Sequence, residues 1–208
     1  MDIMWYIFDM LGTVAFAISG ALVGVAKKMD IFCIIVLALA TAIGGGVIRD
    51  CLVGHFPPNS LQGMAYVLVV CAVSFIVFFI YRTRYYKQVM GLWSRRSYMM
   101  ADALGLASFT VTGASVGYAA YPELPVFIVL LGTITAVGGG ILRDMLAQQI
   151  PSVLKEDVYA LPSIIGGVAY YLMRHGNWTF EPAYGAFMVV LVIRLLALYF
   201  HWSLPKVR

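Results

Sequence analysis

The sequence predicts an all-α membrane protein with seven transmembrane helices, arranged as two inverted three-helix repeats and a seventh helix. Hydrophobic residues make up 62% of the 208 positions and charged residues only 12%, about half of the roughly 25% charged residues of a soluble domain. Segments 31–48 and 62–80 contain no charge, and about 20 apolar residues are enough to cross a bilayer core. The third observation is that the same motifs occur in both halves of the chain.

Hydropathy places the seven helices at 3–26, 31–53, 61–81, 98–120, 125–147, 158–174 and 182–202. Turn-forming residues separate them, including Pro57-Pro58-Asn59 and the prolines at 122, 151 and 182. A basic stretch at 82–96 separates the third and fourth helices. Since no linker is long enough to divide two soluble domains, residues 1–208 are expected to form a single transmembrane domain.

The distribution of Lys and Arg predicts the orientation, because loops on the cytoplasmic side retain these residues. Only Arg174 lies on the opposite side, whereas ten cations occupy the loops after the first, third and fifth helices and the C-terminal tail: Lys27, Lys28, Arg82, Arg84, Lys87, Arg95, Arg96, Lys155, Lys206 and Arg208. We therefore expect the N-terminus outside and the C-terminus in the cytoplasm. The cations form no basic stripe, so no nucleic-acid partner is expected, although the loop at 82–96 is suited to anionic lipid headgroups.

The two halves of the chain repeat each other. Residues 9–24 and 102–117 are identical at 8 of 16 positions, and residues 41–51 and 135–145 at 7 of 11. The first repeat covers about 3–81, the second about 98–174, and the extra helix about 182–202. Because three helices are an odd number, the two copies run in opposite directions across the membrane. Inverted repeats place a transport pathway near their pseudo-two-fold axis, although a purely structural repeat is the alternative.

A glycine triplet lies inside the second helix and another inside the fifth, at Gly44, Gly45, Gly46, Gly138, Gly139 and Gly140. Each glycine lowers helix propensity by about 1 kcal/mol relative to Ala. Three together favour a kink or an unwound turn, which at membrane depth needs protein or water to satisfy the backbone. A water-lined constriction supplies this condition. The alternative is close helix packing, which glycine also permits.

An Arg-Asp pair follows each triplet, and each repeat offers an acidic partner. Arg49 and Asp50 lie toward the outer end of their helix, at the depth of Asp9. The equivalent residues toward the inner end are Arg143, Asp144 and Asp102. A charge at membrane depth costs about 2.5–3.5 kcal/mol, so partners are expected. We predict Asp9–Arg49 and Asp102–Arg143 contacts, one on each membrane face, which either hold the helices together or take part in gating.

Hydroxyl groups recur along the first and fourth helices on the face of the acidic residues. The residues concerned are Ser19, Ser108, Thr112 and Ser115. They are expected either to hydrate a cation in transit or to join the helices by hydrogen bonds, which is the commoner use. Arg194 is the only charged residue in the last predicted helix. Three surroundings are expected as alternatives: it faces a pore, pairs with Asp144 or binds a lipid headgroup. No residues have metal-ligand spacing, so neither a metal nor a cofactor is expected.

With its paired Gly-Gly-Gly-x-x-Arg-Asp motifs in helices arranged as three plus three plus one, the chain resembles the prokaryotic branch of the trimeric intracellular cation channel (TRIC) family over nearly its whole length. The resemblance implies a multi-pass protein of a prokaryotic plasma (inner) membrane. It also implies a homotrimer with one pore per subunit, formed by the first, second, fourth and fifth helices and shaped by kinks at the triplets. Potassium would be the main permeant ion, with sodium as a second one.

Three functional hypotheses follow. A monovalent cation channel fits the doubled triplets, the acidic residues and the resemblance. A secondary transporter of a small amino acid such as glycine fits inverted repeats equally well, and bacterial relatives are also called glycine transporters. An enzyme is disfavoured because Asp50 and Asp144 lie on opposite faces, each beside an arginine. Animal TRIC channels have a Lys-bearing motif where Arg49 and Arg143 stand, so the resemblance does not extend to phosphoinositide gating.

Overall fold

The computed structural model describes residues 3–82, 90–155, 158–176 and 181–202, which form helices joined by short connections. Six helices are long and apolar enough to cross a membrane: α1 (Ile3–Ala26), α2 (Ile31–Val53), α3 (Met64–Arg82), α4 (Met90–Ala120), α5 (Pro125–Leu146) and α8 (Pro182–Phe200). Two shorter helices are α6 (Ser152–Lys155) and α7 (Leu161–His175), and Asn59–Leu61 form a 3-10 turn, η1. This confirms the predicted all-helical membrane protein.

The predicted helix bounds differ from the structure where local geometry decides the ends. The third helix begins at Met64 rather than 61, because Asn59–Leu61 form the separate 3-10 turn. The fourth begins at Met90 rather than 98. The sixth, α7, has only 15 residues, about 22 Å at 1.5 Å per residue, which is shorter than a bilayer core of about 30 Å. It has Pro162 in its first turn and ends at His175, which Gly176 follows.

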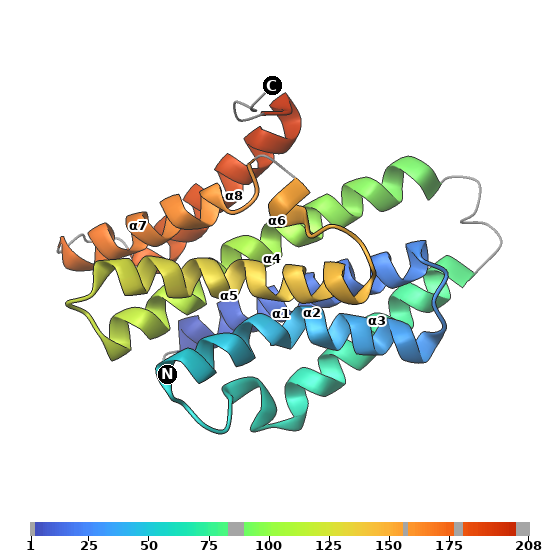
Figure 1. Cartoon of the computed structure of the whole chain (residues 1–208), viewed down its shortest axis with the longest axis horizontal. Coiled ribbons are helices and arrows are strands. Elements are labelled where there is room, and N and C mark those ends of the chain that lie inside the picture. The colour runs from blue at the N-terminus through green and yellow to red at the C-terminus, as the bar shows by residue number, and fades with distance from the viewer. Residues whose placement is uncertain (1–2, 83–89, 156–157, 177–180, 203–208) are drawn as a thin grey trace.

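Four helices form the centre of the molecule, and the remaining long helices flank it (Figure 1). Helices α1, α2, α4 and α5 pack on one another, with α3 against α1 and α2 on one side. On the other side α7 and α8 pack against α4 and α5. Thus α3 and α7 occupy corresponding places in the two repeats, and α8 is the helix without a counterpart.

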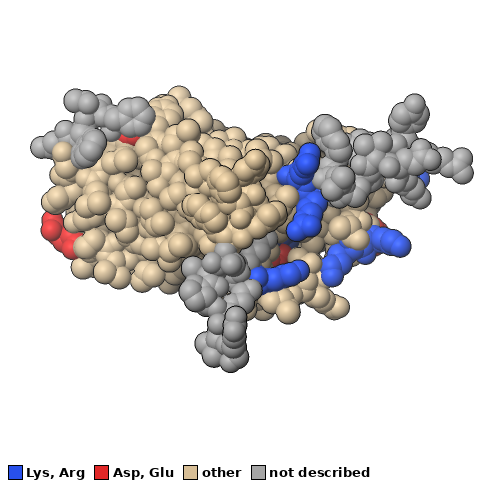
Figure 2. Space-filling view, turned by 90° about the horizontal axis from the view of Figure 1, so that it is seen from above, with Lys and Arg blue, Asp and Glu red and all other residues tan. Residues whose placement is uncertain are grey.

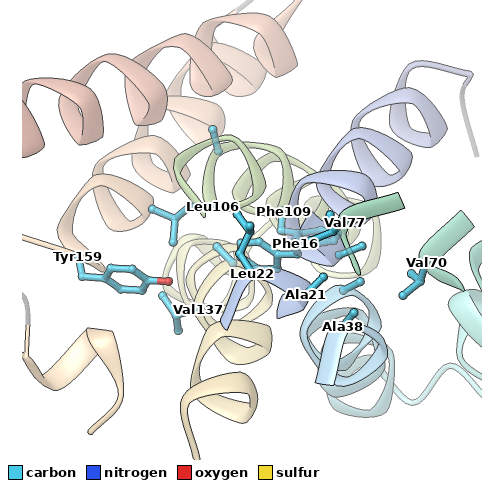
Figure 3. Packing of buried hydrophobic residues seen from close by; sticks show 14 of the residues in the cluster. Phe16, Ala21, Leu22, Ala38, Val70, Val77, Leu106, Phe109, Val137 and Tyr159 are labelled. Carbon is cyan, nitrogen blue, oxygen red and sulfur yellow. The ribbon is translucent and has the colours of Figure 1, made fainter. Parts of the chain in front are cut away.

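The central core is apolar and tightly packed. Phe16, Leu106 and Phe109 lie at its centre, where α1 and α4 cross (Figure 3). Ala21 and Ala38 let α1 and α2 approach. Small residues at such crossings allow the backbones of membrane helices to come close.

Helix α2 has a defined start and end. The Asp30 carboxylate accepts a hydrogen bond of 2.8 Å from the backbone N–H of Cys33, which satisfies one of the unpaired amides of the first turn. At the other end Gly54 adopts a left-handed conformation with φ 77°, which a glycine takes without strain. These caps fix the position of the triplet within the helix.

The charged side chains are distributed unevenly over the surface. In the view of Figure 2, Lys and Arg gather toward one end of the molecule. At that end α1 finishes and α4 begins, and Lys27, Lys28, Arg95 and Arg96 are all exposed there. Four of the cations used to predict the orientation, Arg84, Lys87, Lys206 and Arg208, lie outside the described residues.

Candidate functional site

The first of two buried charged clusters is the Asp9 network, made of Asp9, Arg49, Asp50 and Tyr66. Arg49 Nη1 lies 3.3 Å from Asp9 Oδ1, and Arg49 Nε donates to Asp50 Oδ1 at 2.7 Å. Tyr66 Oη donates to the other oxygen of Asp9, Oδ2, at 2.7 Å. The guanidinium also lies over the ring of Trp5, 5.2 Å from its centroid. Both carboxylates and the arginine are buried, so helices α1, α2 and α3 are joined by a desolvated network.

The second cluster is the Asp102 network, made of Asp102, Arg143, Asp144 and Tyr159. Arg143 Nη1 donates to Asp102 Oδ1 at 2.6 Å, and Arg143 Nε donates to Asp144 Oδ1 at 2.8 Å. Its guanidinium lies over the ring of Tyr98, 5.0 Å from the centroid. The exposed fraction of the Arg143 side chain is 0%. The predicted Asp9–Arg49 and Asp102–Arg143 contacts are therefore confirmed.

The two networks also match in the backbone hydrogen bonds that their aspartates accept. Asp50 Oδ2 accepts a hydrogen bond of 2.8 Å from the N–H of Asn59, and Asp144 Oδ2 accepts one of 2.6 Å from the N–H of Ser152. In both halves the donor lies in the connection that follows the helix. Each Asp therefore fixes a connection, while the neighbouring Arg reaches across to another helix.

Two carboxylates share one guanidinium in each network. Charges at this depth persist only with partners, because desolvation of an ion costs several kcal/mol. The oxygens of Asp9 and Asp50 are all occupied by Arg49, Tyr66 or a backbone N–H. Each network keeps a formal net charge of −1 within its own three ionic groups.

The glycine triplets lie at the contact between α2 and α5. Both helices continue without interruption through Gly44–Gly46 and Gly138–Gly140, so neither triplet forms an unwound turn, while a kink at the triplets stays a prediction. A Cβ at Gly45 would collide with the carbonyl oxygen of Thr135, and a Cβ at Gly139 would collide with the carbonyl oxygen of Thr41. The alternative of close packing therefore describes the triplets, and the collisions are reciprocal across the repeat.

An aromatic pair that the sequence interpretation missed lies beside the triplets. The rings of Phe16 and Phe109 meet edge to face, with centroids 5.2 Å apart. A Cβ at Gly105 would collide with Phe16, and a Cβ at Gly12 would come within 3.0 Å of Phe109. The signal was available, because Phe is one of the identical positions in the alignment of 9–24 with 102–117.

The predicted hydroxyl stripe is divided among several surroundings. Ser19 joins the Asp102 network, where its Oγ accepts a hydrogen bond of 2.7 Å from Arg143 Nη1. Ser108 is fully buried in α4. Thr112 Oγ1 donates to the carbonyl of Phe109 in its own helix at 3.4 Å, and Ser115 is only partly buried, beside Tyr170. Of the four, Ser19 contacts the charged residues directly.

Arg194 of α8 is buried and packs against the second repeat. Its Nη1 donates to the carbonyl of Val158 at 2.8 Å, and its guanidinium lies 4.7 Å from the centroid of the Tyr159 ring. Helix α8 is thereby attached to Tyr159, a member of the Asp102 network. The sequence left three possible surroundings for Arg194, and this aromatic contact was not among them.

A cavity of about 910 Å³ opens beside the Asp102 network. Its lining includes the cationic residues Lys27, Arg95 and Lys155. Gln149 and Ser152, which also line it, donate hydrogen bonds to Asp144. Two residues that line this cavity therefore contact the Asp102 network directly.

Comparison with known proteins places this architecture in a family. The profile of the glycine transporter family matches residues 6–82 and 99–175, one segment for each repeat. The chain belongs to the glycine transporter family. Among the members of this family, the chain is 37% identical over 205 residues to the UPF0126 inner membrane protein YadS of Escherichia coli, covering 96% of this chain and 94% of that protein. It is 34% identical to the UPF0126 membrane protein YvgT of Bacillus subtilis, with 97% and 96% covered.

Solved structures with the same fold are TRIC channels. A prokaryotic TRIC channel in 0.5 M KCl superimposes with a TM-score of 0.89 at 31% identity, covering 98% of this chain and all of that chain. A structure described as the basis for conductance through TRIC cation channels gives a TM-score of 0.82 at 35% identity, covering 97% and 96%. The TRIC orthologue of Rhodobacter sphaeroides gives 0.87 at 29% identity, covering 97% and 100%. This glycine transporter family member is thus similar over its full length to prokaryotic TRIC cation channels.

Proposed function

We propose that the protein is a monovalent cation channel, permeable to potassium, in a prokaryotic inner membrane. The observation that carries the proposal is its full-length similarity, at 31–35% identity, to prokaryotic TRIC cation channels. The family relative YadS is an inner membrane protein, which supports the location. By the same similarity we infer a homotrimer with one pathway in each subunit. The distribution of Lys and Arg supports an outer N-terminus and a cytoplasmic C-terminus.

The pathway we propose runs between α1, α2, α4 and α5. The Asp9 network lies toward one end of these helices and the Asp102 network toward the other, each with two carboxylates for one arginine. Rings of acidic side chains concentrate cations at a pore and exclude anions. The charges are held by Arg49 and Arg143, so rearrangement of either salt bridge exposes a carboxylate to the path.

The middle of this pathway is occupied by packed residues. Gly45 and Gly139 bring α2 and α5 into backbone contact, and Phe16 and Phe109 fill the crossing of α1 and α4. On this proposal the passage of an ion requires α2 and α5 to separate at the triplets. Helices that meet through glycine have few side chains to disengage, so small sliding movements are enough to change the contact.

A carrier of a small amino acid is the second candidate, because the matching family is described as a glycine transporter family. Inverted repeats with a central binding site are equally typical of secondary transporters. The two functions differ in kinetics. A channel passes many ions for each opening, whereas a carrier gives saturable uptake and exchanges labelled for unlabelled substrate across the membrane.

Proteoliposomes distinguish the two. Vesicles loaded with potassium and diluted into potassium-free buffer should develop a membrane potential, reported by a voltage-sensitive dye, without any amino acid present. In parallel, vesicles preloaded with glycine should show no accelerated entry of radiolabelled glycine. Potassium leak at the level of protein-free vesicles, together with saturable glycine counterflow, would replace the channel proposal with the carrier.

A further inference from the structure

The two charged networks differ at one position that the repeat makes equivalent. Tyr66 and Tyr159 are 93 residues apart, the same offset as Asp9 and Asp102. Tyr66 Oη donates directly to Asp9 Oδ2 at 2.7 Å. In the second network three buried atoms have no hydrogen-bond partner within the described part of the chain, namely Tyr159 Oη, Asp102 Oδ2 and Arg143 Nη2.

Two of these atoms, Tyr159 Oη and Arg143 Nη2, lie beside Gly140. A Cβ on Gly140 would lie 2.8 Å from Tyr159 Oη and 3.6 Å from Arg143 Nη2. Asp102 is held against the same guanidinium, since its Oδ1 is 2.6 Å from Arg143 Nη1. The Tyr159 hydroxyl points into the interior of the bundle (Figure 3). The exposed fractions are 1% for Asp102, 0% for Arg143 and 2% for Tyr159.

Helix α8 accounts for the difference between the networks. The guanidinium of Arg194 lies on the Tyr159 ring, and Arg194 Nη1 is anchored to the carbonyl of the preceding residue, Val158. Both contacts act on the segment that carries Tyr159. Since α8 has no equivalent in the first repeat, Tyr66 is not held in this way and reaches its aspartate. Arg194 is therefore a positioning residue for Tyr159.

The chemistry of the three atoms selects the molecule that they bind. Asp102 Oδ2 needs a donor, Arg143 Nη2 needs an acceptor, and Tyr159 Oη takes either role. A metal cation cannot accept from the guanidinium, and an anion would be repelled by the carboxylate. A buried polar atom without a partner costs about 1–3 kcal/mol, and buried waters typically make 2–4 hydrogen bonds to such atoms. We propose that the Asp102 network binds a structural water molecule between Tyr159, Asp102 and Arg143.

X-ray hydroxyl-radical labelling with mass spectrometry tests this proposal without any transport measurement, because radicals form from bound water inside the protein. Tyr159, although 2% exposed, should be oxidised severalfold faster than Tyr66, which is 7% exposed. The rate should be the same in potassium and in a buffer with a large organic cation. Protection of Tyr159 equal to that of Tyr66 would overturn the proposal, and so would labelling that changes with potassium, which indicates an ion in the site.

A pair of glycine variants locates the water. The Cβ of Gly140→Ala would come within 2.8 Å of the Tyr159 hydroxyl and crowd the proposed water, so labelling of Tyr159 should fall to the level of Tyr66. The repeat-equivalent change Gly46→Ala is the matched control, because its Cβ has ordinary contacts, the nearest being Arg49 Nη2 at 3.7 Å. It should leave Tyr159 labelling unchanged. Unchanged labelling in Gly140→Ala would contradict the placement, whatever the outcome of the flux experiments.

Discussion

Phe16 and Phe109 are repeat equivalents that meet each other at the centre of the bundle, with ring centroids 5.2 Å apart. Each ring also lies against a glycine of the opposite helix, Phe16 on Gly105 and Phe109 on Gly12. The pair stands between the Asp9 network and the Asp102 network. The proposed pathway therefore has a charged cluster toward each end and an apolar plug in the middle, a combination that restricts ions by excluding water.

Removing the phenyl ring of either Phe16 or Phe109 should widen the middle of the proposed pathway. Phe16→Ala and Phe109→Ala should each raise single-channel conductance or open probability, and each should lower stability by about 3–5 kcal/mol, as for buried Phe in other cores. Phe75→Ala is the control, since Phe75 is 45% exposed on α3. Planar-bilayer recording and thermal unfolding in detergent provide the two readouts. Conductance equal to the wild type in both central variants would place the path elsewhere.

A methyl group at the centre of either triplet should disturb the contact between α2 and α5. Gly45→Ala would push against the Thr135 carbonyl, which belongs to backbone and cannot rotate away, whereas the Cβ of Gly46→Ala has room. We expect Gly45→Ala to lower the unfolding temperature and change the open probability, with Gly46→Ala close to the wild type. Identical behaviour of the two variants would mean that close packing at Gly45 is unimportant.

The repeats, the salt-bridge partners and most helix bounds could be predicted because they depend on local composition and on spacing. Of the kink and the unwound turn that the sequence suggested, the unwound turn is absent, because helix propensity describes an isolated helix. In the folded protein Gly45 and Gly139 pack against backbone carbonyls of the opposite helix. Arg194 and Tyr159 could not be paired from the sequence, since nothing in the spacing of α8 fixes its rotation. The only sign of the Phe16–Phe109 contact in the sequence is that both repeats have Phe at this position.

Removing the arginine of a network should be strongly destabilising. Arg143→Gln leaves the carboxylates of Asp102 and Asp144 buried without their cation, and breaking a buried ion pair in this way typically costs about 3–5 kcal/mol. The double variant Arg143→Gln with Asp102→Asn should recover part of the loss, because one uncompensated charge is removed. Arg96→Gln, at an exposed position of α4, is the control. Thermal unfolding in detergent measures all three, and equal stability of Arg143→Gln and Arg96→Gln would contradict the network.

The N-terminal cap of α2, Asp30, should make the stability of the folded protein depend on pH in the acidic range. Asp30 lies in the exposed connection before α2, and hydrogen bonds from Cys33 lower its pKa. A lowered pKa in the folded state means that the stabilisation is present above the ordinary carboxyl pKa and is lost as pH falls through the lowered value. Asn caps helices about as well as Asp but does not titrate. On acidification the unfolding temperature of the wild type should therefore fall relative to that of Asp30→Asn. A difference between the two that stays constant with pH would contradict this role.

The central claim is that cations pass between α1, α2, α4 and α5 of each subunit. Planar-bilayer recording of the purified protein under asymmetric KCl tests it most directly, with Gly45→Ala and Gly46→Ala measured beside the wild type. We predict unitary currents that reverse near the potassium equilibrium potential, altered by Gly45→Ala and not by Gly46→Ala. The claim would be contradicted if the wild-type protein gave no current in bilayers while the same preparation was active in glycine counterflow.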